Sequence, residues 1–317
     1  MQKAGRKDLT RPFFCGTLKL KYNLMEHKME QKERWNIYYV SMGAPSLTML
    51  LKQLDGNFGL NDIIEDDLPD EVVYVNLGFD WPEVTKTVQA VKELCQKYAI
   101  QFTELAYESF KEDMINKKIT KYSRPLNWET NLMWRAYLLR LQKGRGWCGG
   151  KIRWGTQIKQ NLIKKHTKLR ENEHKEVYSF LGICSNEAHR ISRPSFKEVK
   201  NFKYPLIEQQ LSKEYCIQYV KQLGWPVSRL YEIGLTHIGC WCCRNHNIKE
   251  IVALRTKCPQ IYEQLKELEK LIKEPYYRSP KGWALLDDVR WQTTKYQEVK
   301  EQIKEKIGED NEDESGS

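Results

Sequence analysis

The feature that most constrains the fold is an alternation of apolar strand and amphipathic helix that begins at residue 36. Residues 36–40 (NIYYV) are β-branched and aromatic, which is typical of a strand. A Ser/Gly/Pro turn at 41–46 leads into a Leu- and Met-rich helix, and we assign its N-cap to Ser46.

A second unit of the same kind follows. The buried-type strand 71–75 leads through a turn that contains Gly78 into a helix opened by Pro82, and a third strand is expected at 100–107 (IQFTELAY). This order predicts an α/β protein with a parallel, Rossmann-like sheet flanked by helices and right-handed crossovers. Ligands of such sheets bind beyond the carboxyl ends of the strands, where both turns are expected.

The remainder of the chain reads as mostly helical. Residues 125–175 have a helical and basic pattern, and residues 176–183 (EVYSFLGI) predict one further strand before a polar turn. Helices are expected from Ser212 to Leu223 and over 248–274, with a break near Pro259. We therefore expect three regions: a basic N-terminal arm (1–34) with one short strand, an α/β domain (35–210), and a helical C-terminal region with a cysteine cluster and an acidic tail (211–317).

Composition excludes several classes of protein. A hydrophobic share of 40% and an aromatic share of 11% in 317 residues supply a sizeable core. No apolar run approaches the roughly 20 residues of a membrane span, and the N-terminal residues lack a secretory signal. We expect a cytoplasmic protein without a membrane partner, whose nine cysteines are not a disulfide scaffold. The sequence does not indicate an oligomeric state.

Positive charge is concentrated in residues 114–170. This segment has fifteen Lys or Arg residues and one acid, Glu129, a net charge of +14 in a chain whose total is +10. Three interpretations remain open: a solvated helical surface, a group of cations around an anionic ligand, or a groove for DNA or RNA. The interleaved tryptophans favour the last, because bases stack on aromatic rings.

Three cysteines lie within four residues near the C-terminal helices. Cys240 and Cys243 have the CxxC spacing of a two-ligand hairpin for zinc or an iron–sulfur cluster, and Cys242 adds a third thiol. His237 and His246 flank them as further candidates. The alternative is that all of these are buried reduced thiols without a metal.

Several short motifs occur in an order that is informative as a set. They are YYVSMGAPSLTMLL, EVVYVNLGFDWPEV, IRWGTQIK, FLGICSNEAHR, KYPLIE and GCWCCRN, spread over roughly residues 36–270. The series resembles the phosphoadenosine phosphosulfate (PAPS) reductase family, within the PP-loop ATP pyrophosphatase superfamily, and in particular its divergent phage and mobile-element members with a CWCC box. The resemblance implies an adenine nucleotide alpha hydrolase-like fold that binds ATP or a PAPS-like adenine nucleotide.

The first turn departs from the family pattern SGGKDS at two important positions. Ser41, Gly43 and Ser46 match it, whereas Ala44 replaces the lysine and Pro45 the aspartate. A lysine at that position assists the departure of pyrophosphate, so its loss argues against ATP cleavage. Sulfonucleotide reductases of the same superfamily also lack this lysine, and nucleotide binding therefore remains the expectation.

Other family boxes are present with single changes. Gly78 matches the second turn, Arg153 matches an RWCT box in which Gly155 replaces the cysteine, and Glu187 and Arg190 match the box after the last strand. The resemblance thus implies a nucleotide site of Ser41, Gly43, Ser46, Gly78, Arg153, Lys159, Glu187 and Arg190, whose cations neutralise phosphate or sulfate.

The resemblance implies a [4Fe–4S] cluster completed by the cysteine of the RWCT box, a position that is Gly155 in this sequence. Cys148 and Cys258 are the candidates to replace it, which gives the predicted ligand set Cys148, Cys240, Cys243 and Cys258, with zinc as the less favoured metal. Cys148 and Cys242 are the predicted catalytic thiols. The resemblance implies an oxidoreductase or sulfur transferase with adenylyl or sulfur-transfer chemistry. The alternative is a catalytically degenerate accessory protein that binds DNA or RNA through residues 114–170 in a defence, modification or mobile-element system.

Overall fold

A five-stranded parallel sheet forms the centre of the molecule. The computed structural model describes residues 34–55, 67–106, 147, 154–192, 201–272, 275–279, 282–284 and 286. The predicted N-terminal arm and most of the basic segment lie outside these residues. The strands are β1 (Arg34–Tyr39), β2 (Glu71–Asn76), β3 (Gln101–Ala106), β4 (Glu176–Leu181) and β5 (Phe202–Lys203). Their order is β3-β2-β1-β4-β5, and every pairing is parallel. The predicted Rossmann-like α/β class is confirmed.

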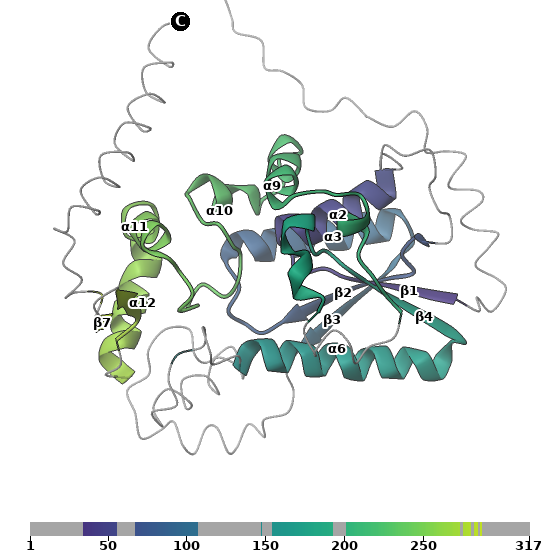
Figure 1. Cartoon of the computed structure of the whole chain (residues 1–317), viewed down its shortest axis with the longest axis horizontal. Coiled ribbons are helices and arrows are strands. Elements are labelled where there is room, and N and C mark those ends of the chain that lie inside the picture. Colours follow the sequence, from purple (N-terminus) through teal and green to yellow (C-terminus); the bar gives the residue numbers. More distant parts are fainter. Residues whose placement is uncertain are drawn as a thin grey trace, which may run out of the picture.

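Helices cover both faces of this sheet. In chain order they are α2 (Ala44–Asp55), α3 (Pro82–Lys97), α6 (Trp154–Glu173), the 3-10 helix η3 (Ser185–Arg190), α8 (Pro205–Glu208), α9 (Lys213–Gln222), α10 (Ser228–Glu232), α11 (Ile248–Lys257) and α12 (Pro259–Ile272). Figure 1 shows α2 and α3 on one face and α6 on the other. A short antiparallel pair, β6 (Tyr277–Ser279) and β7 (Gly282–Ala284), follows α12.

The two faces of β1 belong to two separate apolar clusters. Tyr38 packs in the large cluster with α2 and α3, and its ring stacks on Phe180 at 4.4 Å between centroids. Ile37 and Tyr39 point the other way, into a small cluster with Val73 and Val177. Successive strand residues face opposite sides, so the consecutive buried apolar and aromatic residues 37–39 of β1 are what a doubly covered parallel strand requires.

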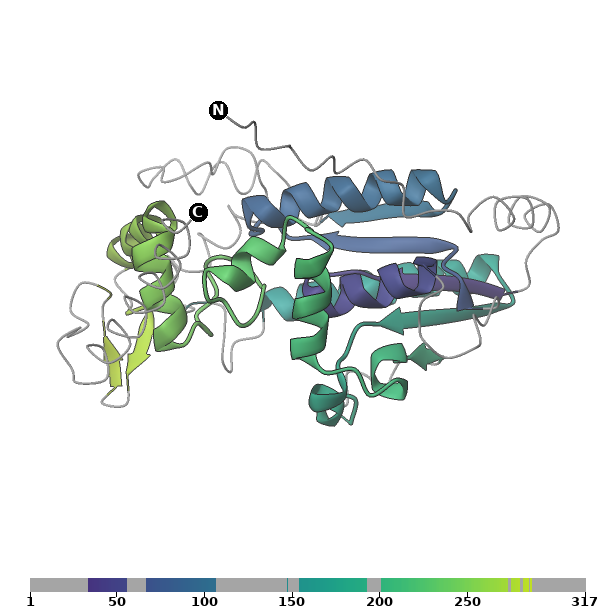
Figure 2. The same cartoon turned by 90° about the horizontal axis from the view of Figure 1, so that it is seen from above.

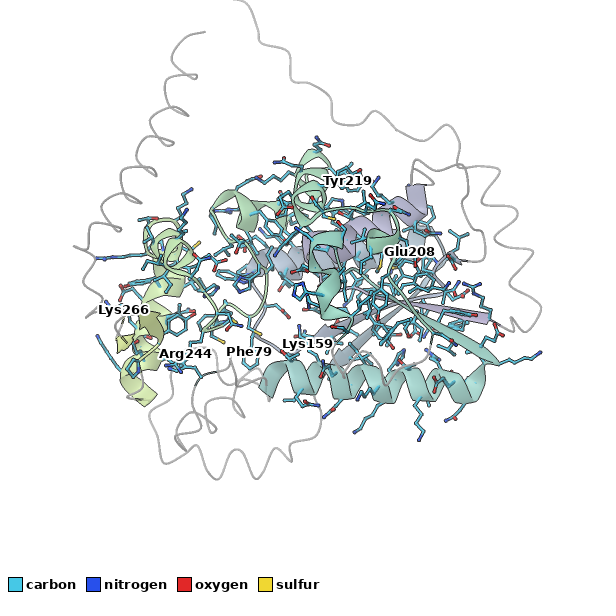
Figure 3. The ribbon with its side chains drawn as sticks, in the orientation of Figure 1. Phe79, Lys159, Glu208, Tyr219, Arg244 and Lys266 are labelled. Atoms are coloured by element: carbon cyan, nitrogen blue, oxygen red, sulfur yellow. The ribbon has the colours of Figure 1, made fainter. Side chains whose placement is uncertain are left out.

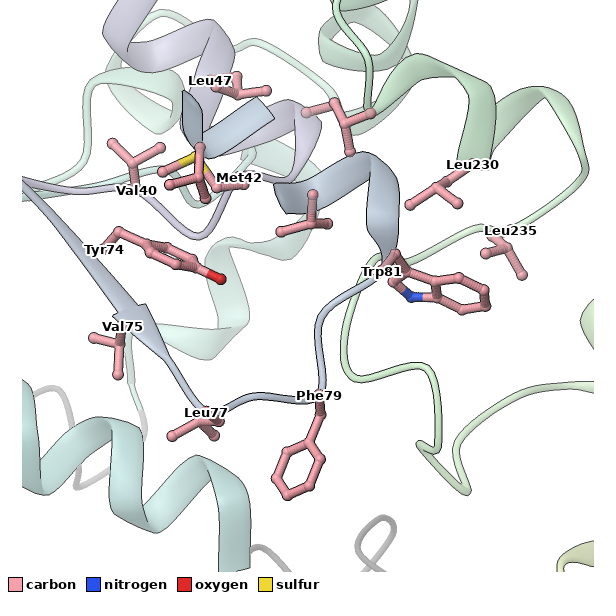
Figure 4. Close-up of a cluster of buried hydrophobic side chains, with 14 of the residues drawn as sticks. Val40, Met42, Leu47, Tyr74, Val75, Leu77, Phe79, Trp81, Leu230 and Leu235 are labelled. Carbon is pink, nitrogen blue, oxygen red and sulfur yellow. The ribbon is translucent and has the colours of Figure 1, made fainter. Parts of the chain in front are cut away.

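The C-terminal helices lie beyond the carboxyl ends of the strands. Figure 2 shows α10, α11 and α12 at that end of the sheet, while α9 lies beside α2. In the close-up of Figure 4, Trp81 at the start of α3 lies next to Leu230 and Leu235, and all three side chains are at most 2% exposed. The large cluster therefore continues from the sheet into the C-terminal region.

Most expected elements are confirmed, with one correction. The break near Pro259 separates α11 from α12, and Ser212 caps α9 by accepting the Tyr215 N–H at 3.2 Å. Ser46 is not the N-cap of the first helix, because α2 begins two residues earlier at Ala44. Ser46 has its side chain directed back to the turn instead, as the hydrogen bonds below show.

No helix among the described residues is both long enough and apolar enough to cross a membrane.

Candidate functional site

A cavity of about 390 Å³ lies at the carboxyl ends of β1, β2 and β4. Consecutive crossovers leave the sheet in opposite directions between β1 and β4, so this is the topological switch point where ligands of parallel sheets bind. Its wall comes from the first turn, from α6, from the segment that follows β4, and from the C-terminal region. The side chains that the argument uses are Ser41, Ser46, Lys159, Glu187, Arg190 and Tyr231.

The turn between β1 and α2 is built from its own hydrogen bonds. Ser46 Oγ accepts the Ser41 N–H at 3.1 Å and donates to the carbonyl oxygen of Gly43 at 3.1 Å. Met42 adopts a left-handed conformation with φ 62°, a region that favours glycine and costs another residue on the order of 1 kcal/mol. The chain accepts this strain in a buried residue, and the turn is consequently held in one conformation.

The start of α2 has fewer free amide donors than an ordinary helix. The first four N–H groups of a helix have no acceptor within it, which makes such an end attractive to anions. Here the Ala44 N–H donates to the hydroxyl oxygen of Tyr231 at 2.9 Å, and Pro45 has no N–H. Two of the amide positions that could bind an anion, Ala44 and Pro45, therefore have no N–H available to a ligand.

Gly182 allows β4 to approach this turn closely. A Cβ atom at Gly182 would lie 2.6 Å from Ser46 Cα and 2.7 Å from Ser46 N, distances that Cβ atoms do not reach in proteins. Only glycine can therefore follow β4 at this point without moving α2. The close approach brings η3, with Glu187 and Arg190, to the same cavity.

Cations surround the cavity. Lys159 and Lys164 come from α6, Lys213 from the start of α9, and Arg190 from η3. Arg190 Nη1 is paired with Glu187 Oε2 at 2.8 Å, and both side chains remain partly exposed. In Figure 3, Lys159 lies near the amino-terminal end of α6, between the sheet and the C-terminal helices. The cavity therefore suits an anionic ligand.

His237 lines the cavity on the side of residues 240–243, the cysteine box. The neighbouring Cys243 side chain and the Glu250 carboxylate, whose Oε1 lies 3.1 Å from His237 Nδ1, raise the pKa of His237 to about 9. Glu250 is fully buried. Burial alone would raise its pKa, but hydrogen bonds from His237 and from the amides of Thr236 and Asn247 hold it at about 2. The pair adds a cationic imidazole to the wall at neutral pH.

The cysteine box forms a tight turn next to the second strand–helix turn. The Cys243 N–H donates to the carbonyl oxygen of Cys240 at 3.0 Å, and the Trp241 N–H donates to that of Phe79 at 3.0 Å. Cys240 and Cys243 are partly exposed, whereas Cys242 is only 2% exposed. The predicted catalytic thiol of Cys242 is thus buried in the apolar cluster rather than presented to the cavity.

The described cysteines do not complete a metal site. Cys258 lies at the junction of α11 and α12, where burial and the nearby Glu83 raise the pKa of its thiol. Within the described ranges, no group of three or more His, Cys, Asp and Glu side chains is arranged to hold a metal ion. Cys148 and Arg153 lie outside those ranges. We therefore derive no chemical step through a cluster.

The predicted nucleotide residues are brought together in large part. Ser41, Gly43, Ser46, Lys159, Glu187 and Arg190 all line the cavity. Gly78 is not among the lining residues, and its N–H is already bonded to Asn76 Oδ1 at 2.7 Å. Its positive φ of 74° explains the glycine without a ligand.

Sequence reasoning did not single out Tyr231, Gly182 or Lys213. Gly182 had a signal, since a glycine directly after a buried strand often marks a close backbone approach. Tyr231 had none, because it is one of seventeen tyrosines and approaches the turn only through the folding of a segment 187 residues away.

Comparisons with known proteins find only distant similarities. No model of a protein family matches it. An uncharacterized protein of Methanocaldococcus jannaschii is 24% identical over 230 residues, which make up 70% of this chain and 40% of that protein. The chain thus matches about two fifths of that relative's length. Among solved structures, the tRNA thiolase NcsA from Methanococcus maripaludis, with its [4Fe–4S] cluster, aligns over 86% of this chain and 82% of its own, with 12% identity and a TM-score of 0.34.

Proposed function

We propose that the protein binds an adenine nucleotide in the cavity between β1 and β4, as a divergent relative of the PAPS reductase family. The observation that carries this proposal is the convergence of the first turn with Lys159, Lys164, Lys213 and Arg190 around one cavity at the switch point. These groups come from four separate parts of the chain.

The cations have separate roles in this proposal. Lys159 is a point charge that neutralises a phosphate or sulfate, since an ammonium donates in any direction. Arg190 is held by Glu187 in the free protein at 2.8 Å. An anion would compete with Glu187 for the guanidinium, whose planar fork suits two oxygens of a phosphate.

The chemistry that we propose is adenylyl or sulfur transfer. His237 and Ile238 line the cavity, and Cys240 follows Ile238 by two residues, so the proposal requires a thiol of residues 240–243 to approach a bound nucleotide from beyond this wall. Cys240 and Cys243 are the better candidates for this step, because their side chains are partly exposed while Cys242 is buried. The loss of the turn lysine at Ala44 favours a nucleotide that arrives already activated over ATP cleavage.

The metal assignment stays a separate prediction. The CxxC turn supplies two thiols, and Trp147, the residue before Cys148, is buried with its ring 4.9 Å from that of Tyr276. The Tyr276 hydroxyl in turn donates to the carbonyl oxygen of Cys243. This contact supports Cys148 as a third thiol. Iron, sulfide and zinc analysis after anaerobic purification tests the assignment, and protein free of all three would refute it.

Isothermal titration with AMP and ATP tests the nucleotide proposal. Lys159→Ala should weaken binding of the tighter nucleotide by about tenfold, since a hydrogen bond to a charged group contributes roughly 1.5–3 kcal/mol. Lys168→Ala is the matched control, because Lys168 lies on the same helix but is exposed and does not line the cavity. Equal affinities for the two variants, or no binding by the wild type, would overturn the proposal.

Nucleic-acid binding is the second candidate. Five cations of the basic segment are described, all on α6. Lys159 and Lys164 line the cavity and Arg170 is bonded to Glu71, which leaves Lys165 and Lys168 on the exposed face. That face supports a backbone contact. Affinity for single-stranded RNA or DNA should then fall steeply with salt and weaken in the Lys165→Ala/Lys168→Ala double variant, while nucleotide affinity stays unchanged.

A further inference from the structure

Tyr231 occupies the position at the start of α2 where an anion would be expected. Its side chain is 8% exposed, it lines the cavity, and its hydroxyl oxygen accepts the Ala44 N–H at 2.9 Å. A Cβ atom at Gly43 would lie 3.6 Å from the same oxygen, so the hydroxyl lies directly over the turn. The oxygen therefore makes the hydrogen bond that an oxygen of a bound phosphate would otherwise make.

The hydroxyl can still donate. Its oxygen accepts from Ala44, and its own proton has no acceptor among the residues that the structure describes. Burial raises the pKa of Tyr231 to about 12, so the proton stays on the oxygen at neutral pH. The side chain is more than nine-tenths buried and belongs to the cavity wall. A neutral O–H donor in that position, with no acceptor among the described residues, is suited to an anionic ligand.

The start of α2 also offers few amide donors to a chain of several phosphates. A chain of phosphates that enters a strand–helix turn needs successive N–H donors along it. Here Tyr231 blocks the Ala44 donor and Pro45 supplies none. Lys159 and Arg190 instead approach from the opposite elements, α6 and η3.

We propose that Tyr231 determines specificity: it takes the place of one phosphate oxygen at the start of α2 and donates its O–H to a single 5′-phosphate, so that the cavity selects a nucleotide with one 5′-phosphate, either a monophosphate or its mixed anhydride with sulfate, over a triphosphate. The inference rests on the proposed nucleotide function and narrows its substrate class. Tyr231 thereby limits the number of phosphate groups that the cavity accepts. It touches the ligand but takes no part in bond making.

The test is isothermal titration of AMP and of ATP into the wild type, Tyr231→Phe and Tyr262→Phe. The wild type should bind AMP about tenfold more tightly than ATP. Tyr231→Phe removes the donor and frees the Ala44 N–H, so AMP should bind more weakly, ATP more tightly, and the preference should disappear. Tyr262→Phe is the matched control. It also removes a buried hydroxyl, one that donates to the carbonyl oxygen of Leu286 away from the cavity, and it should keep the wild-type preference.

A competition measurement on the wild type covers the case in which Tyr231→Phe does not fold. Inorganic phosphate should displace AMP at least as well as tripolyphosphate does. A preference for ATP or for tripolyphosphate in the wild type, or an AMP preference that survives in Tyr231→Phe, overturns the inference and leaves nucleotide binding intact. Binding of neither nucleotide by the wild type overturns the proposed function, and the inference with it.

Discussion

A fully buried glutamate lies next to a histidine both in strand β2 and in helix α11, but only the histidine beside the glutamate of α11 lines a cavity. Glu71 lies at the start of β2 and Glu250 in the first turn of α11, and both are 0% exposed. The pKa of each carboxyl is about 2. By residue type, burial and ionisation the two are the same.

Their partners differ. Two nitrogens of the Arg170 guanidinium donate to Glu71: Nε to Oε2 at 2.9 Å and Nη2 to Oε1 at 3.0 Å. His166 Nε2 lies 3.1 Å from Glu71 Oε1. All of these connect β2 to α6. The described partners of Glu250 are the amides of Thr236 and Asn247, the Thr236 hydroxyl, and His237, which lines the cavity.

A buried carboxylate with a lowered pKa is therefore not by itself the sign of a functional site. Perturbed ionisation is frequent at functional sites, but ion pairs within the fold produce it too. The distinction lies in the partner: Arg170 is bonded to the two carboxylates Glu71 and Glu173 and does not line the cavity, whereas His237 lines space that a ligand can enter. The following substitutions test that distinction.

The largest effect is expected from Glu71→Gln. The change leaves the buried face of Arg170 opposite an amide, and loss of one partner of a buried pair costs about 3–5 kcal/mol of unfolding free energy. Urea denaturation measures it. Glu173→Gln is the control, because Glu173 contacts the same arginine at 2.6 Å but is 43% exposed, and it should cost under about 1 kcal/mol. Equal losses would show that Glu71 does not hold α6 to the sheet.

The free energy of unfolding should fall at acid pH because of both buried glutamates, Glu71 and Glu250. Burial raises the pKa of Glu71, but hydrogen bonds from His166, Arg170 and Thr103 outweigh it. Because each folded-state pKa lies below the unfolded value, the contribution to stability is present above about pH 4.5 and is lost as the pH falls toward 2. A difference of about 2.5 pH units corresponds to roughly 3 kcal/mol for each carboxyl. Denaturation at several pH values should show Glu71→Gln with a shallower acid limb, and an unchanged limb would refute the assignment.

A smaller effect is expected at the cavity end from Gly182→Ala. The new methyl group must push α2 away from β4, and such overpacking costs about 1–3 kcal/mol. Gly155→Ala is the control, since a Cβ there meets only Leu77 Cδ1 at 3.6 Å. Gly182→Ala should also weaken AMP binding while Gly155→Ala does not. Should Gly182→Ala match the wild type in both stability and binding, the close approach of β4 to the first turn would not matter for the site.

The sequence was sufficient for the sheet and for much of the cavity wall. The apolar runs at 36–40 and 71–75 predict doubly covered strands because they lack the alternation of a half-exposed strand. The turn pattern of Ser41, Gly43 and Ser46 then places a site at the carboxyl ends by topology alone. Lys159 and Arg190 follow from the family resemblance.

What the sequence could not predict depends on contacts between distant segments. Tyr231 reaches Ala44 only because α10 packs beside the start of α2, and no local pattern records that contact. The Ser46 N-cap was wrong because serine suits a cap in any sequence. In this chain the residues before it, with Met42 in a left-handed conformation, bend tightly enough for the helix to begin at Ala44.

A crystal structure of the protein with AMP tests the central claim most directly. We predict the phosphate in the cavity between β1 and β4, within hydrogen-bond distance of Lys159 and of the Tyr231 hydroxyl. A phosphate bound elsewhere on the molecule, with the cavity filled only by solvent, would contradict the account.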